Sequence, residues 1–208
     1  MKKLIITLTA IALLSLRASA APLEGSEPRY TSHYRHTDQQ IGDFVVDQST
    51  TAPLQIVLMA RLNVPPVQAF DLVSRQLTAW VAQIPHVEWD HKNSAAAGEC
   101  GKGSVRVCDF GKDKIVENIA YWKEGSIYAY KVASEHSTAP FPIKNHLGIF
   151  IVESDGSGGS LITWRQYFNR KFSLMAPMVR WGMRAKVMEP GLRKLIEQHG
   201  GELVKANF

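Results

Sequence analysis

The chain has 208 residues, with 24 lysine and arginine residues against 19 aspartate and glutamate residues, and a formal net charge of +5. Lys2, Lys3 and Arg17 lie in the first 20 residues; without them 21 basic residues face 19 acidic ones, a net charge of +2. No long run of lysine and arginine remains, so the composition argues against a nucleic-acid partner.

Residues 1–20 have the pattern of a secretory signal peptide. A positive start is followed by an apolar run from Leu4 to Leu16 and by the small residues Ala18-Ser19-Ala20. An uncleaved membrane anchor is the less favoured interpretation, because spanning a bilayer takes about 20 apolar residues. We therefore expect a periplasmic or secreted protein whose mature form begins at Ala21.

Residues 21–50 are expected to be a polar lead-in segment that precedes the core. His33 and His36 have a spacing that occurs in metal sites, but two histidines on a mobile surface arm are the favoured interpretation. The sequence indicates no metal and no cofactor. Residues 51–208 are expected to form one domain with a sizeable core.

The domain begins with a strand and a helical stretch. Apolar residues alternate over residues 54–62, which predicts a strand with one buried face. Pro65-Pro66 ends this strand and opens a helical stretch that continues to Ile84. Strands joined by short turns are then predicted at 86–92, 104–110, 115–122, 126–133, 144–153 and 160–169. Successive strands with short links predict an antiparallel sheet.

The last segment changes to a helical period. The residues of its apolar stripe are Leu174, Met178, Trp181, Ala185, Met188, Leu192 and Leu195. Pro190 should bend this helix without ending it, and Gly200-Gly201 should end it. Met175, Met178, Met183 and Met188 make the helix a candidate for a deformable cavity wall, although ordinary core packing explains any one of them.

The turns also place candidate ligand-binding residues on one face of the sheet. A two-residue turn at Lys112-Asp113 would pair Gly111 with Lys114, and a second turn lies at Glu124-Gly125. The shared face then holds Arg106, Cys108, Phe110, Ile115, Glu117, Ile119, Tyr121, Tyr128, Tyr130 and Val132. Arg106 and Glu117 either orient a polar head group or form a structural cross-strand pair near a rim.

The predicted ligand-binding set is Arg106, Phe110, Glu117, Tyr121, Tyr128, Tyr130, Met178 and Trp181. No catalytic set is identified. His86 and Asp90 share a strand face and could polarise each other, whereas His146 is expected to be structural. Cys100 and Cys108 can pair if residues 101–107 form an open loop, and cannot if 101–103 form a tight turn; both alternatives stay open.

The order of elements resembles the helix-grip fold of the START and birch-pollen-allergen-like superfamily, which includes polyketide cyclase/dehydrase and lipid-transfer proteins. The resemblance covers about residues 54–199. It rests on the order of the segments VPPVQAFDLV (64–73), GSVR (103–106), ENI (117–119) and GGSLITW (158–164). It implies an α+β domain in which a curved antiparallel sheet of about seven strands wraps around the long C-terminal helix.

The resemblance also implies a cavity between the sheet and this helix. Its usual contents are a lipid, sterol, quinone or polyketide. The favoured function is an exported binder or carrier of such a molecule; the alternative is a cyclase or dehydratase acting on a polyketide-like substrate in the same cavity. Fold alone establishes neither function. Transient membrane contact is a further interaction that the sequence leaves open.

Overall fold

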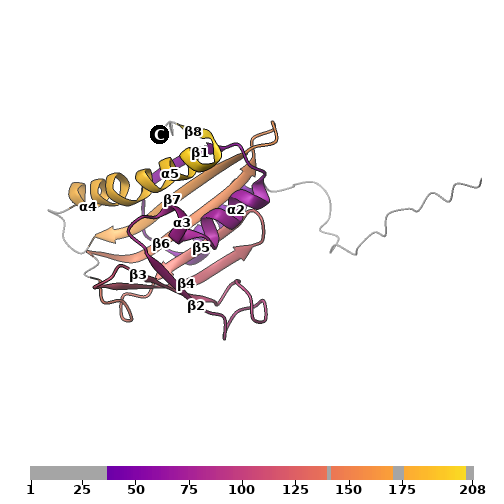
Figure 1. Cartoon of the computed structure of the whole chain (residues 1–208). Helices are drawn as coiled ribbons and strands as arrows, with labels where there is room; N and C mark the ends of the chain where they lie inside the picture. Colours follow the sequence, from indigo (N-terminus) through magenta and orange to yellow (C-terminus); the bar gives the residue numbers. More distant parts are fainter. Residues whose placement is uncertain (1–36, 140–141, 171–175, 205–208) are drawn as a thin grey trace, which may run out of the picture. The chain divides into compact units, whose positions relative to one another are not determined.

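The computed structural model describes residues 37–139, 142–170 and 176–204, which form an α+β domain around one antiparallel sheet (Figure 1). The strands are β1 (Leu54–Leu62), β2 (His86–Asp90), β3 (Val105–Asp109), β4 (Lys114–Lys123), β5 (Ile127–Val132), β6 (Ile143–Ser154), β7 (Ser160–Arg170) and β8 (Gly201–Val204). The helices are α1 (Asp38–Ser49), α2 (Pro66–Ser74), α3 (Leu77–Trp80), α4 (Ala176–Met183), the π-helical turn η2 (Arg184–Met188) and α5 (Glu189–His199). Among the described residues, none of the helices has the length and apolarity that crossing a membrane requires.

The sheet has the strand order β2-β3-β4-β5-β6-β7-β1-β8, and each pair of neighbours is antiparallel. The seven strands predicted from the sequence are present, and β1 has the predicted bounds. The eighth strand, β8, follows directly after Gly200 and pairs with β1. It lies where the sequence indicated only the end of a helix.

The helical stretch after β1 is shorter and more broken than predicted. It forms the two helices α2 and α3, separated by Arg75 and Gln76, and α3 ends at Trp80 instead of continuing to Ile84. Trp80 ties the two helices together, because its indole Nε1 donates a hydrogen bond of 2.9 Å to the carbonyl oxygen of Leu72. The pair covers the inner face of the sheet next to the C-terminal helix (Figure 1).

The C-terminal helix runs through Pro190 without stopping, as predicted. It is helical from Ala176 to His199, and its irregular part is the π-helical turn η2 just before the proline. Proline has no N–H for the carbonyl of Lys186 four residues earlier. That carbonyl oxygen instead accepts a 2.6 Å hydrogen bond from Nε2 of Gln83. The irregular turn is therefore stabilised from outside the helix.

Part of the predicted lead-in belongs to the core, which corrects the expectation for residues 38–49. They form α1, which begins with a capping box between Thr37 and Gln40. Its buried residues Val45 and Val46 pack with apolar side chains of the outer face of the sheet. The segment is largely polar because only this narrow stripe is buried.

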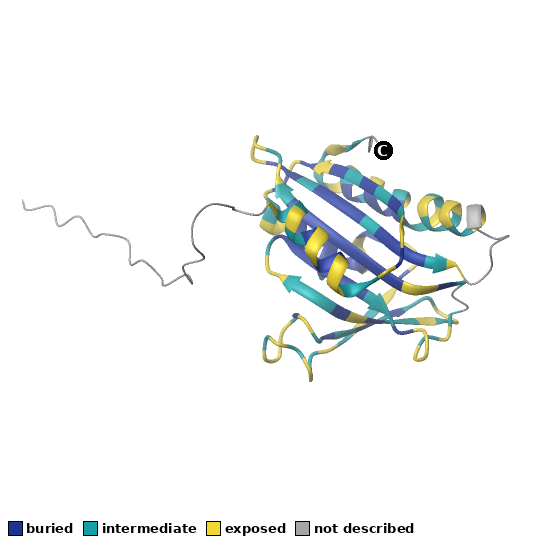
Figure 2. Cartoon of the chain, turned by 180° about the vertical axis from the view of Figure 1, so that it is seen from behind, coloured by how far each residue is buried: buried dark blue, intermediate teal, exposed yellow. Residues whose placement is uncertain are grey.

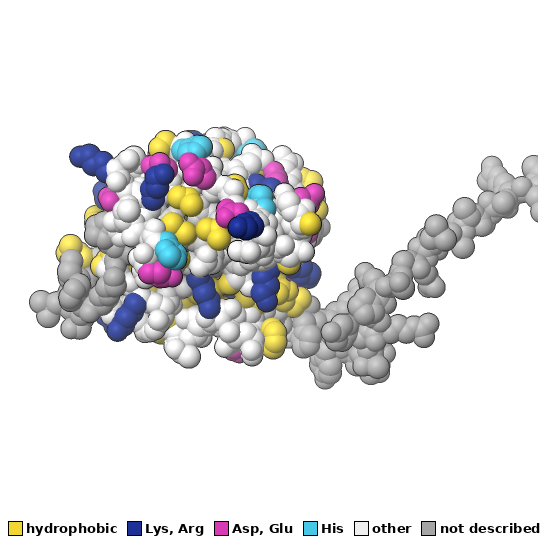
Figure 3. Space-filling model, turned by 90° about the horizontal axis from the view of Figure 1, so that it is seen from below, with side chains coloured by type: hydrophobic (Ala, Val, Ile, Leu, Met, Phe, Trp, Pro, Cys, Tyr) yellow, Lys and Arg dark blue, Asp and Glu magenta, His cyan; other side chains and the backbone are white. Residues whose placement is uncertain are grey.

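The sheet separates two apolar clusters, one on each face. Figure 2 shows the outer face, where α1 lies across the largely buried central strands. The smaller cluster lies under α1 and includes Ile127, Ala129, Leu147, Ile149 and Ile151. The larger lies between the inner face and the helices α2, α3 and α5, and it holds most of the aromatic residues. On the side of the molecule shown in Figure 3, acidic and basic side chains are interspersed.

Candidate ligand-binding cavity

A cavity of about 180 Å³ lies between the inner face of the sheet, α3 and the C-terminal helix. Its wall is mainly apolar and aromatic, and it includes Trp80, Tyr128, Tyr130, Phe150 and Trp164. The predicted position of a cavity therefore agrees with the structure. The volume is below the roughly 300–1,000 Å³ typical of sites for drug-sized ligands, so the space suits a more compact molecule.

Five of the eight predicted ligand-binding residues line this cavity: Arg106, Phe110, Glu117, Tyr128 and Tyr130. They come from β3, β4, β5 and the loop after β3. The register of β3 and β4 differs from the prediction, because Asp109 and not Gly111 pairs with Lys114. A shift of two residues leaves each side chain on its predicted face, since side chains alternate with a period of two.

Tyr121 is not a cavity residue, and a β-bulge is the reason. In the pairing of β4 with β5, Ile119 lies opposite Tyr130 and Tyr121 lies opposite Ala129, so Ala120 is an extra residue. The extra residue turns Tyr121 to the outer face, where it packs against the cluster under α1. Trp122 takes its place on the inner side.

Met178 and Trp181 also lie outside the cavity, with exposed fractions of 66% and 60%. The wall is instead formed by Met183, Val187 and Met188. The π-helical turn η2 explains the difference, because its hydrogen bonds span five residues and add one residue to the turn. In the part of the helix that precedes Met188, the buried apolar stripe is therefore shifted from the predicted positions to Met183 and Val187.

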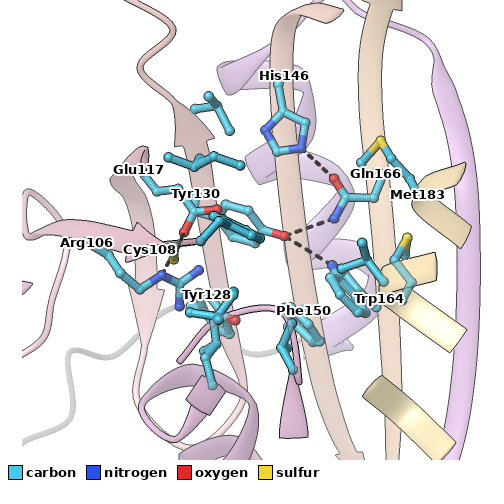
Figure 4. A pocket seen from close by; sticks show the side chains of 18 of the residues that line it. Arg106, Cys108, Glu117, Tyr128, Tyr130, His146, Phe150, Trp164, Gln166 and Met183 are labelled. Carbon is cyan, nitrogen blue, oxygen red and sulfur yellow. Dashed lines mark hydrogen bonds and ion pairs between the residues drawn. The ribbon is translucent and has the colours of Figure 1, made fainter. Parts of the chain in front are cut away.

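Arg106 and Glu117 form a buried ion pair in the cavity wall (Figure 4). They lie directly opposite each other on β3 and β4, with 2.7 Å between Nε of Arg106 and Oε2 of Glu117. Their exposed fractions are 1% and 8%, so the pair is structural and cross-strand but does not lie at a rim. A guanidinium N–H also donates to the carbonyl oxygen of Ser74 at 3.2 Å.

Aromatic rings surround the Arg106 guanidinium. Its central carbon lies 5.4, 5.7 and 5.1 Å from the ring centroids of Trp89, Tyr128 and Tyr130. Burial by itself lowers the pKa of Arg106, but Glu117 and other surrounding groups outweigh it and raise the pKa well above its usual value. The guanidinium therefore keeps its charge, which the Glu117 carboxylate and the ring faces compensate.

The two cysteines are free in this structure. Cys108 lies on β3 in the cavity wall, and its thiol donates to Oε2 of Glu117 at 3.5 Å. Burial, followed by the charge of Glu117, raises the pKa of this thiol well above its usual range. Cys108 is therefore protonated and a poor nucleophile at neutral pH.

A chain of hydrogen bonds that the sequence did not predict forms the polar part of the wall (Figure 4). Nε2 of Gln166 donates to the Tyr130 hydroxyl at 2.9 Å, and Nε1 of Trp164 donates to the same oxygen at 3.2 Å. Because the Gln166 amide nitrogen is used in this way, its oxygen accepts from Nε2 of His146, at 2.5 Å. Burial lowers the pKa of His146, so its imidazole is neutral at pH 7.

Comparison with known proteins shows the fold but no close relative. No protein-family model matches the chain, and no curated protein matches it. Among solved structures, a protein from Thermobifida fusca has a TM-score of 0.58 at 20% identity, over 70% of this chain and 92% of its own. XoxI from Bacillus cereus has a TM-score of 0.55 at 19% identity, over 69% and 94%. Ara h 8.0201, a birch-pollen-allergen-like protein, has a TM-score of 0.52 at 19% identity, over 69% and 94%.

The domain has the helix-grip fold. As the resemblance implies, the sheet packs around the C-terminal helix, and the cavity lies between the sheet and this helix. Sequence identities of about 20% to these structures support a shared fold. They do not identify the ligand, the site residues or an activity.

The other candidate sites of the sequence do not assemble beside this helix-grip cavity. His86 and Asp90 are exposed; His86 lies 3.4 Å from a Glu88 carboxylate oxygen, and the Asp90 carboxylate accepts from the backbone N–H of Lys92. His33 and His36 lie outside the described residues. Within the described ranges, no group of three or more histidine, cysteine, aspartate or glutamate residues could hold a metal ion.

Proposed function

We propose that this protein is an exported binder or carrier of a compact hydrophobic small molecule, held in the cavity between the sheet and the C-terminal helix. The observation that carries the proposal is the apolar cavity itself, in a fold that in general accommodates hydrophobic ligands. Its volume of about 180 Å³ suits one ring system or one end of a longer molecule, so a whole diacyl lipid is a poor candidate.

Apolar burial supplies most of the binding energy in this proposal. Each square ångström of apolar surface removed from water contributes roughly 25 cal/mol. Arg106 and Glu117 contribute little net charge, because they neutralise each other across 2.7 Å. A neutral ligand therefore fits the wall better than an anion, which would add a second buried negative charge beside Glu117.

Export and membrane contact belong to the same proposal. The signal-peptide-like pattern of residues 1–20 supports the proposal of action in the periplasm or outside the cell. Met178 and Trp181 are exposed on α4, and Nζ of Lys186 lies 5.4 Å from the Trp181 ring centroid. Exposed tryptophan beside a basic side chain suits the interface of an anionic membrane, and cosedimentation with anionic vesicles tests this transient contact.

The alternative of a cyclase or dehydratase has less support. General acid–base catalysis needs groups that exchange protons near neutral pH. In the cavity, Glu117 is held in the ion pair, and burial raises the pKa of Tyr130 and of Cys108 far from neutrality. These groups are suited to hold a ligand more than to transfer protons to it.

A matched pair of tryptophan variants tests the binding proposal. Met183→Trp places a large ring in the cavity wall, whereas Met178→Trp adds the same ring at an exposed position of the same helix. Native mass spectrometry and displacement of a fluorescent hydrophobic probe should show binding in wild type and Met178→Trp, and at least a tenfold weaker affinity in Met183→Trp, about 1.4 kcal/mol. Circular dichroism controls for folding. Equal binding by all three proteins would place the ligand elsewhere and contradict the proposal.

A further inference from the structure

The Tyr130 hydroxyl uses its oxygen twice as an acceptor and leaves its proton without a protein acceptor. Its two hydrogen bonds come from Nε2 of Gln166 and Nε1 of Trp164, and an indole nitrogen can only donate. Among residues 37–139, 142–170 and 176–204, no acceptor is found for the phenol proton. Tyr130 is nearly fully buried and lines the cavity.

The neighbouring tyrosine shows that this arrangement is specific to Tyr130. Tyr128 lies two residues earlier on the same face of β5, with its ring stacked 5.9 Å from that of Tyr130. Its hydroxyl donates to the carbonyl oxygen of Val73 at 2.7 Å, so its proton is used within the protein. The two phenols therefore have opposite roles, although both are buried in the same wall.

The surroundings hold the Tyr130 hydroxyl firmly in place. Tyr130 lies opposite Gly148 on β6, and a methyl group added at Gly148 would come within 2.6 Å of the phenol oxygen. A side chain at position 148 would displace the Tyr130 ring, so the absence of a side chain at Gly148 leaves the space that this ring occupies. Burial raises the pKa of Tyr130 well above its usual value, so the hydroxyl keeps the proton that it can donate.

From this geometry we infer that Tyr130 is a ligand-binding donor, and that the ligand is a neutral, mainly apolar molecule with a carbonyl oxygen placed to accept the Tyr130 proton. The inference rests on the proposed function and narrows it from any hydrophobic molecule to a carbonyl-bearing one. A buried hydroxyl proton without an acceptor costs free energy, and the ligand oxygen removes that cost. The two donors on the phenol oxygen also polarise the O–H group and strengthen its donation.

Paired probes of nearly equal shape test this inference: 1-indanone, which carries a ketone, and indane, which does not. Tyr130→Phe should weaken binding of 1-indanone about 3- to 10-fold more than it weakens binding of indane, the range expected for one hydrogen bond. Tyr128→Phe should weaken both probes alike, because its proton serves the Val73 carbonyl. Isothermal titration calorimetry on the folded variants measures the four ratios.

A spectroscopic readout separates donation by Tyr130 from a merely structural role. The infrared carbonyl band of bound ¹³C-labelled 1-indanone should lie below its position in cyclohexane, and 3-fluorotyrosine at position 130 should lower it further, because fluorine makes the phenol a stronger donor. The same substitution at position 128 should leave the band unchanged. An unshifted band, or equal weakening of both probes by Tyr130→Phe, would overturn the inference and leave the proposed function standing. If the wild-type protein binds neither 1-indanone nor indane, both the inference and the proposed function are overturned.

Discussion

The Arg106–Glu117 pair predicts a large loss of stability when its acidic partner is removed. Glu117→Ala leaves the guanidinium at an exposed fraction of 1%, with its charge no longer compensated by a carboxylate at 2.7 Å. Loss of one partner of a buried pair costs about 3–5 kcal/mol, because the remaining charge is still desolvated. We expect the free energy of unfolding to fall by that amount.

A second arginine–glutamate pair in the same sheet provides the control. Arg61 and Glu202 lie directly opposite each other on β1 and β8, 2.8 Å apart, but their side chains are largely exposed. Exposed pairs contribute about 0.2–1 kcal/mol, so Glu202→Ala should cost no more than that. The two pairs share their chemistry and their cross-strand geometry; they differ in burial, and Arg61 also keeps a second carboxylate, that of Asp155, 3.6 Å from its Nε.

Urea unfolding followed by circular dichroism measures both losses. An unchanged slope with denaturant shows that only stability has changed. The double variant Arg106→Met/Glu117→Leu should regain most of the stability lost in Glu117→Ala, because it removes the charge as well as its partner. If Glu117→Ala costs no more than Glu202→Ala, water reaches the pair and the reasoning from burial is refuted.

Two further variants test other parts of the cavity wall. Gly148→Ala should destabilise the protein by about 1–3 kcal/mol in the same urea assay, because the added methyl group meets the Tyr130 ring. Gly182→Ala on α4 is the control: its methyl group would enter open space, so the change should be neutral or stabilising by up to about 1 kcal/mol. Burial lowers the pKa of His146, so below about pH 6.5 the unfolded chain binds a proton that the folded protein does not. The free energy of unfolding should therefore fall as the pH drops below about 6.5, by at most about 1.4 kcal/mol per pH unit. His146→Gln should flatten this dependence, and parallel pH profiles of the two proteins would contradict the assignment.

Alternation along the strands carried most of the fold prediction. The bounds of β1 and the face that holds Arg106 and Glu117 follow from a period of two, which survives even the wrong turn between β3 and β4. By contrast, β8 is four residues long, and its pairing with β1 joins segments about 140 residues apart in sequence. No local pattern reports such a contact. Similarly, α1 has few buried residues, and its stripe matters only once the sheet is formed.

The wrong site residues have a common physical cause. Tyr121 and Met178 were assigned by counting along a regular strand and a regular helix. One extra residue at Ala120 moves Tyr121, which follows it, to the other face of the sheet, and one extra residue in the turn Arg184–Met188 shifts the buried face of the helix that precedes Met188. Gln166 could have been found, because it lies on one face of β7 with Ile162, Trp164 and Phe168. A glutamine on an otherwise apolar face signals a buried polar contact.

Polar anchors on the aromatic rings explain why the cavity stays open between two apolar surfaces. Three of the rings that line it are held at a polar end: Tyr128 by the Val73 carbonyl, Trp80 by the Leu72 carbonyl, and Trp164 by the Tyr130 hydroxyl. Moving a ring inward would break a buried hydrogen bond, which costs about 1–3 kcal/mol for each group left unsatisfied. Filling the space would recover roughly 25 cal/mol per Å² of apolar surface, so only a shift that buries more than about 40–120 Å² would repay one broken bond. A ligand gains the same burial without breaking any of these bonds, which favours occupation of the cavity over its collapse.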